Sequence, residues 1–80
     1  MIYLYMDTHT FMNIQNMNAT EARSKIFIQQ MQFAGEIKRG ILISRMHVSE
    51  QTFTREYLTY LDMYPTIKYD KPNRIFRNDP

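Results

Sequence analysis

Hydrogen-bonding side chains and one arginine gather in a short stretch of this 80-residue chain, from Val48 to Tyr57. Ser49 is a residue type that begins helices, and Phe53 and Tyr57 follow it at helical spacing. The face opposite those aromatic residues would carry hydroxyl, amide and guanidinium groups, from Ser49, Gln51, Thr52, Thr54 and Arg55. Side chains of these types read the edges of bases in the major groove of DNA, so the stretch predicts a helix that contacts DNA.

Gln51 and Arg55 are the strongest candidates for direct base contact in this helix. Glutamine pairs with adenine and arginine with guanine, and each good pair discriminates between bases by about 1–3 kcal/mol. Two alternatives stay open: Thr52 packs against the preceding helix, and Arg55 contacts only phosphate.

Basic residues flank the predicted helix on both sides, although the net charge of the whole chain is only +2. We expect them to hold phosphates on either side of the groove or at the adjacent minor groove: Lys38, Arg39, Arg45, Lys71 and Arg74. Five such contacts predict a slope of log K against log salt of about −4 to −5 per protomer. The alternative is that they are solvated surface charges.

The basic tail reads as two short strands that follow the helix. One face is expected to carry Ile67, Tyr69, Ile75 and Arg77, and the other Lys68, Asp70 and Phe76. A turn at Lys71–Arg74 would join the strands, because proline and asparagine favour turns. A two-stranded ribbon is marginal alone, so it should pack on the third helix through Ile67, Tyr69 or Phe76.

Two further helices are expected before this one. Asn18 and Glu21 form a capping pattern for a helix over about 19–34, which Gly35 would end. Its apolar side is expected from residues at broadly helical spacing: Ala22, Ile26, Met31 and Phe33 or Ala34. A second helix of about ten residues would begin at Glu36 and carry Ile37, Ile41, Leu42 and Met46 on one side.

The connection between the second and third helices is short. His47 and Val48 form it, with His47 as a surface turn residue and Val48 anchored in the core. The third helix would bury Phe53, Tyr57, Tyr60, Leu61 and Tyr64 and end at Pro65. Two helices joined by so short a turn predict a helix-turn-helix. The fold class expected is therefore α+β and mostly α: three helices plus a C-terminal two-stranded wing.

The run Val48-Ser49-x-x-Thr52-x-x-Arg55-Glu56-Tyr57-x-x-Tyr60 resembles the helix-turn-helix of DeoR-type regulators. The continuation from Tyr64 to Phe76 resembles the N-terminal winged domain of WYL-domain transcription regulators, and the likeness covers roughly residues 20–77. Glu56 and Tyr57 stand where those proteins usually have aspartate and leucine. The resemblance implies DNA binding. It supplies no inducer, because no ligand-sensing domain follows the wing in this sequence.

Composition bears on the other classes of function. The chain has no cysteine, and its two histidines, His9 and His47, are far apart, so we expect no metal and no cofactor. We expect no enzyme, because no set of nucleophile, base and acid and no glycine-rich phosphate loop is present. No apolar run approaches the roughly 20 residues of a membrane span, so a cytoplasmic protein is expected. No small-molecule effector site is expected either, because no ligand-sensing domain follows the wing.

Residues 1–17 are rich in methionine, aromatic and aliphatic residues and fit no single pattern. They are expected to form an N-terminal arm, either loosely docked or used for dimerisation, ahead of a winged domain at 18–80. The function expected is sequence-specific binding of double-stranded DNA by a homodimer, as a small transcriptional repressor of phage or plasmid type. The alternative is a small protein-binding inhibitor of a host defence complex, built on a winged-helix scaffold.

Overall fold

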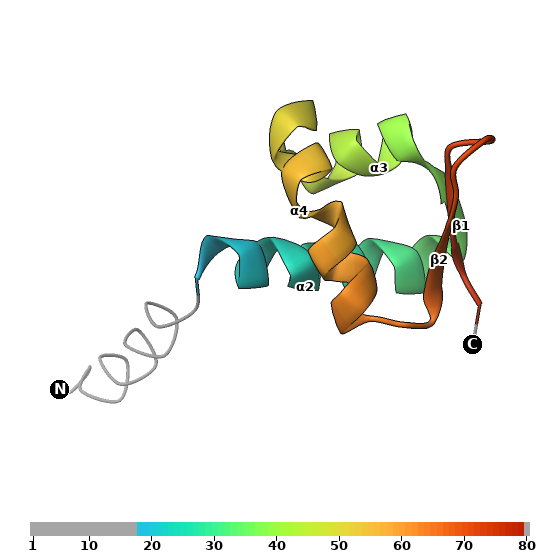
Figure 1. The fold of residues 1–80 in the computed structure, drawn as a ribbon, viewed down its shortest axis with the longest axis horizontal. Helices are drawn as coiled ribbons and strands as arrows, with labels where there is room; N and C mark the ends of the chain where they lie inside the picture. Colours follow the sequence, from blue (N-terminus) through green and yellow to red (C-terminus); the bar gives the residue numbers. More distant parts are fainter. Residues whose placement is uncertain (1–17, 80) are drawn as a thin grey trace, which may run out of the picture.

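The structure, a computed structural model, describes residues 18–79. Its elements are α2 (Ala19–Ala34), β1 (Glu36–Lys38), α3 (Arg39–Met46), α4 (Glu50–Met63), β2 (Ile67–Asp70) and β3 (Ile75–Asn78). Helix α4 starts beside α3 and runs across α2, and the sheet stands at one end of the helical layer (Figure 1). The expected α+β fold, mostly α, is confirmed for this part of the chain. The predicted arm at residues 1–17 lies outside it.

Helix α2 begins and ends where its capping residues predict. The Asn18 side chain accepts a hydrogen bond from the Glu21 backbone N–H at 2.7 Å, and Gly35 closes the helix with a φ of 75°. The predicted apolar side is only partly correct: Met31 is buried and Ala34 packs against the core, but Ile26 and Phe33 do not. Ser24, Phe27 and Met31 face the core, whereas Ile26 and Phe33 are exposed. Apolar residues occur on several sides of α2, so spacing alone does not single out one face.

Strand β1 corrects the prediction that a second helix begins at Glu36. Ile37 is buried between the exposed residues Glu36 and Lys38, which is the alternation of a strand, and α3 starts only at Arg39. The three residues pair with β3, from Glu36 opposite Arg77 to Lys38 opposite Ile75. Three residues are too few to display a strand period, and their partner lies far along the chain.

Helix α4 is joined to α3 by the predicted short turn. His47 is exposed and adopts a left-handed conformation with a φ of 58°, and the half-buried Val48 packs against the core. The Ser49 side chain caps α4, which ends at Met63, ahead of Pro65. Of the five residues expected on the buried side of α4, Phe53 and Tyr60 are fully buried, and Tyr57, Leu61 and Tyr64 are half-buried against the core.

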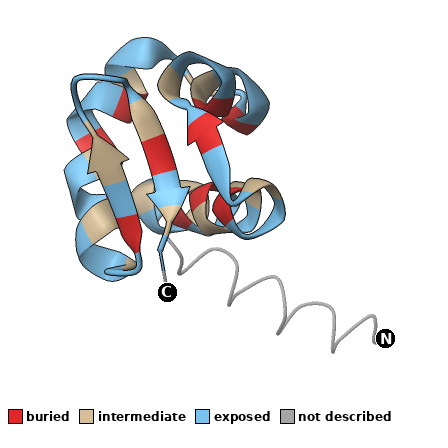
Figure 2. Cartoon of the chain, turned by 90° about the vertical axis from the view of Figure 1, so that its right-hand side faces the viewer, coloured by how far each residue is buried: buried red, intermediate tan, exposed pale blue. Residues whose placement is uncertain are grey.

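The sheet has three antiparallel strands in the order β1–β3–β2, instead of the two expected. Tyr69 pairs with Phe76, so both side chains lie on one face, and their rings stack at 4.2 Å. Directly paired residues in antiparallel strands share a face, so the predicted direction of Phe76 is wrong. The predicted directions of Ile75 and Arg77 are wrong as well, because they pair with Asp70 and Lys68 on the other face. Each strand carries one buried position toward the helices (Figure 2).

Aromatic rings from three elements meet at the centre of the core. Phe27 of α2 lies 5.0 Å from Tyr60 of α4 and 5.8 Å from Phe76 of β3, measured between ring centroids. Phe53 completes the group at 5.6 Å from Phe76, edge to face. Such contacts add about 0.5–1.5 kcal/mol each beyond area burial. These ring contacts pack the sheet, α2 and α4 against one another, and they set the orientation of α4 relative to the sheet.

Candidate nucleic-acid interface

The outer face of α4 carries three of the predicted base-contact residues in exposed positions: Gln51, Thr54 and Arg55. They lie three and four residues apart, opposite the buried Phe53 and Tyr60. The side chain of Arg55 is 66% exposed, and its Nη2 lies 3.9 Å from the carboxylate of Glu56. At this separation, and with the Arg55 side of the pair in solvent, the interaction is weak, so the Arg55 guanidinium is available to another partner.

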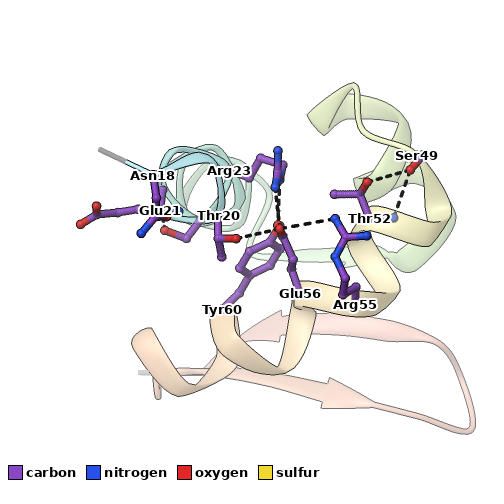
Figure 3. Close-up of polar contacts among 10 residues, drawn as sticks. Asn18, Thr20, Glu21, Arg23, Ser49, Thr52, Arg55, Glu56 and Tyr60 are labelled. Carbon is purple, nitrogen blue, oxygen red and sulfur yellow. Dashed lines mark hydrogen bonds and ion pairs between the residues drawn. The ribbon is translucent and has the colours of Figure 1, made fainter. Parts of the chain in front are cut away.

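Ser49 and Thr52, the other two predicted base-contact residues, are engaged with each other. Ser49 Oγ accepts a hydrogen bond from the Thr52 backbone N–H at 3.0 Å and donates one to Thr52 Oγ1 at 2.9 Å (Figure 3). These bonds satisfy a backbone donor that the first turn of a helix leaves unpaired. The two hydroxyls therefore set where α4 begins, and base contact would compete with that role.

Arg39 is the most constrained of the predicted phosphate-binding residues. Its guanidinium lies 5.4 Å from the ring centroid of Phe53 and donates from Nη2 to Thr54 Oγ1 at 2.6 Å. Its Nη1 also lies 3.6 Å from the Glu50 carboxylate, and the side chain is only 11% exposed. Arg39 thus holds the start of α3 against α4.

The wing, which is the turn Lys71–Arg74 between β2 and β3, stands next to both helices. Arg74 has a left-handed φ of 57°, and its carbonyl accepts a hydrogen bond from the Arg39 N–H at 2.8 Å. Within the turn, Asn73 Nδ2 donates to Asp70 Oδ2 at 2.9 Å. The wing is therefore tied at its tip to the first residue of α3.

Two surface hollows meet at Arg39. The α3–wing hollow has a volume of about 420 Å³ and is lined by Lys38, Arg39, Gly40, Ile43, Glu50, Asn73 and Arg74. The α4–wing hollow has a volume of about 460 Å³ and is lined by Arg39, Thr54, Tyr57, Tyr69, Lys71, Pro72 and Arg74. The fold thus gathers four of the five predicted phosphate-binding residues around two adjoining concave surfaces beside α4.

Arg45 is the predicted phosphate-binding residue that the fold places apart. It lines a third hollow beside β1 with Ala34, Ile37, Lys38 and Ile41, and it does not line the two hollows next to α4. On α3, Arg45 lies between about a third and a half of a turn away from Arg39, Gly40 and Ile43, because successive residues are about 100° apart. Lys38 lines both this hollow and the α3–wing hollow, whereas Arg45 shares no hollow with Arg39, Lys71 or Arg74.

Glu56 is a buried polar centre that the sequence analysis did not identify. Arg23 Nε donates to its Oε1 at 2.8 Å, Thr20 Oγ1 to its Oε2 at 2.8 Å and the Tyr60 hydroxyl to its Oε1 at 2.6 Å (Figure 3). These bonds connect α2 with α4. The spacing Phe53–Glu56–Tyr60 is helical and places the acid on the core face, which is the signal that would have found it.

The partners of Glu56 control its protonation. Hydrogen bonding by the Arg23 guanidinium, aided by Tyr60 and Thr20, lowers the pKa of Glu56 to about 2 against the opposing effect of burial. Burial and the adjacent carboxylate raise the pKa of the Tyr60 hydroxyl. Glu56 is thus an anion across the physiological pH range, and Arg23, Thr20 and Tyr60 donate their hydrogen bonds to it.

Among residues 18–79, no three His, Cys, Asp or Glu side chains are grouped so that they could hold a metal ion. Within that range no helix has both the length and the apolar character needed to cross a bilayer. In comparisons with known proteins, no family model, no curated protein and no solved structure matches this chain.

Proposed function

We propose that this protein binds double-stranded DNA sequence-specifically, as a small transcriptional repressor. The observation that carries the proposal is the outer face of α4, where Gln51, Thr54 and Arg55 are exposed beside two hollows lined by basic residues. A helix of about 10–12 Å diameter fits the major groove of B-DNA, which is about 12 Å wide. Gln51 and Arg55 would then reach base edges, while Lys71 and Arg74 of the wing contact backbone phosphates.

The order of the elements supports a winged helix-turn-helix as the scaffold. A short turn at His47 joins α3 to α4, and a hairpin with a basic tip follows α4 and packs beside it. In such a scaffold α4 is the recognition helix, whose N-terminal residues contact bases.

Binding as a two-fold dimer would double this small interface. Half-sites would lie about one helical turn of DNA apart. Ile26 and Phe33 lie seven residues apart on one side of α2 and are 37% and 86% exposed. We propose that side of α2, together with residues 1–17, as the contact between protomers.

The proposal is tested by selecting binding sites from random duplexes, followed by mobility shifts on the selected site. Arg55→Ala should weaken binding about tenfold or more and relax the preference at one base pair. Lys71→Ala should weaken binding to all duplexes similarly. Lys25→Ala, a change at an exposed residue of α2, is the matched control and should bind normally.

An inverted repeat among the selected duplexes would support both DNA specificity and the dimer. The proposal fails if no duplex is enriched, or if neither Arg55→Ala nor Lys71→Ala weakens binding while both proteins remain folded.

A second candidate function, docking on a host protein, is favoured by Leu58. This side chain is 66% exposed on the outer face of α4, among the residues proposed to face DNA. Exposed apolar side chains within a polar face occur at protein interfaces. If this function holds, a stoichiometric partner should be captured from nuclease-treated host lysate. Leu58→Gln should lose that partner, whereas Lys71→Gln should retain it.

A further inference from the structure

Glu50 is an acid placed among the basic residues that surround the α3–wing hollow. It is the first residue of α4, its side chain is 71% exposed, and its carboxylate lies 3.6 Å from Arg39 Nη1. Lys38, Arg39 and Arg74 line the same hollow. An exposed carboxylate here repels a phosphate group, so it lowers the affinity of this surface for DNA of any sequence.

Stabilisation of the helix N-terminus explains why an acid occurs in the first turn of α4. It does not explain why that acid lies among basic residues. Glu21 lies in the first turn of α2, where an acid also interacts favourably with the helix dipole. Its side chain points away from α4, toward solvent (Figure 3). Glu50 instead lies next to the residues proposed to approach DNA, so its charge acts on whatever binds there.

The Glu50 side chain has one charged neighbour within ion-pair distance, the Arg39 guanidinium. The Arg39 guanidinium is fixed by the Phe53 ring and by its hydrogen bond to Thr54, and it offers Nη1 to the carboxylate. Glu50 and Thr54 are four residues apart and therefore lie on the same side of α4. A carboxylate at the N-terminal end of a recognition helix can accept a hydrogen bond from the N4 amino group of cytosine.

We propose that Glu50 is a specificity-determining residue, which selects a cytosine in the bound duplex and penalises binding to other sequences. This inference rests on the proposed function. The acid reduces attraction to the phosphate backbone everywhere, and it recovers that loss only where a cytosine amino group meets its carboxylate. Specificity would thereby increase even though affinity for random DNA falls.

The experiment compares the wild-type protein with Glu50→Gln, Glu50→Ala and the matched control Glu21→Gln. Each protein is passed through selection from random duplexes, and binding is then measured on the wild-type site and on a scrambled duplex at one salt concentration. Thermal unfolding of each variant checks that it is folded.

The wild-type protein should enrich a cytosine at one position of each half-site. Both Glu50 variants should lose that preference and keep the rest of the site. Their affinity for the selected duplex should fall about tenfold, and their affinity for the scrambled duplex should rise about threefold. Glu21→Gln should behave like the wild type.

The selection experiment distinguishes failure of the Glu50 inference from failure of the proposed DNA binding. If the wild type enriches a site and both Glu50 variants enrich the same site, including its cytosine, the inference is wrong and the proposed function stands. If the folded wild-type protein enriches no duplex, the proposed function fails and the inference fails with it.

Discussion

At the scale of single residues, the Glu56 carboxylate is a buried charge whose stability depends on its hydrogen-bond donors. It is only 5% exposed, and it accepts hydrogen bonds from Thr20, Arg23 and Tyr60. Burying a charge is unfavourable unless it is paired and hydrogen-bonded, so this anion and its donors depend on one another. Its removal leaves the buried Tyr60 hydroxyl and part of Arg23 without their acceptor.

We therefore expect Glu56→Ala to lower the free energy of unfolding by about 2–4 kcal/mol. Glu56→Gln should have a smaller effect, because the amide keeps the volume and one acceptor oxygen. Asp62→Asn, at an exposed acid of the same helix, is the control and should change stability by about 0.5 kcal/mol or less. Urea unfolding measures all three, and equal effects for Glu56→Ala and Asp62→Asn would contradict this account.

The pH dependence of stability follows from the same group. The pKa of Glu56 is about 2 in the folded protein, mainly because of Arg23, whereas an unfolded glutamate titrates at about 4.3. Between these values the unfolded chain binds more protons, so the stabilisation is complete above about pH 5 and is lost as pH falls toward 2. Urea midpoints measured from pH 6 to pH 2.5 should fall, and less steeply for Glu56→Gln. Parallel curves for the two proteins would contradict the prediction.

At the scale of elements, the two glycines of the chain stand at opposite kinds of position. Gly35 ends α2 with a φ of 75°, a conformation that residues with a Cβ rarely adopt. Gly40 lies within α3, and nothing lies within 4 Å of a Cβ added there. The backbone conformation at Gly35 therefore requires glycine, whereas the conformation at Gly40 also suits a residue with a Cβ.

Gly35→Ala should therefore destabilise the protein by about 1–2 kcal/mol, and Gly40→Ala should stabilise it by up to ~1 kcal/mol. Each substitution serves as the control for the other, because both add one methyl group without a steric clash. Thermal unfolding midpoints that shift in the same direction would show that the backbone conformations do not decide the outcome.

At the scale of the whole molecule, the arrangement of positive charge sets the salt dependence of the proposed DNA binding. Of the five basic residues expected at phosphates, Lys38, Lys71 and Arg74 are exposed beside α4, Arg39 is bound to Glu50 and Thr54, and Arg45 lies elsewhere. Three phosphate contacts predict a slope of log K against log salt of about −3 per protomer, shallower than the sequence alone suggests.

Lys71→Gln should reduce the magnitude of that slope by about 1, whereas Arg45→Gln should leave it unchanged. The measurement is a titration of a labelled duplex at several salt concentrations. A change in slope for Arg45→Gln equal to that for Lys71→Gln would mean that DNA covers the side of α3 facing β1.

What the sequence predicts correctly is mostly local. The bounds of α2 follow from Asn18 and Gly35, and the start of α4 follows from Ser49, because caps act within one helical turn. Strand β1 and the direction of Phe76 depend instead on pairing between segments distant in sequence, which local patterns do not encode. The basic residues were recognised by type, but only the packed fold separates Arg45 from Lys71.

The central place of β3 in the sheet has a consequence for how the chain folds. Both β1 and β2 pair with β3, and the Glu36–Arg77 contact closes a loop of 41 residues. Closing such a loop costs conformational entropy before any long-range contact repays it. The hairpin of β2 and β3 can form locally, but β1 is completed only when this loop closes. We therefore expect the helices, sheet and wing to assemble in one cooperative step, with the docking of β3 against α2 and β1 as its slow event.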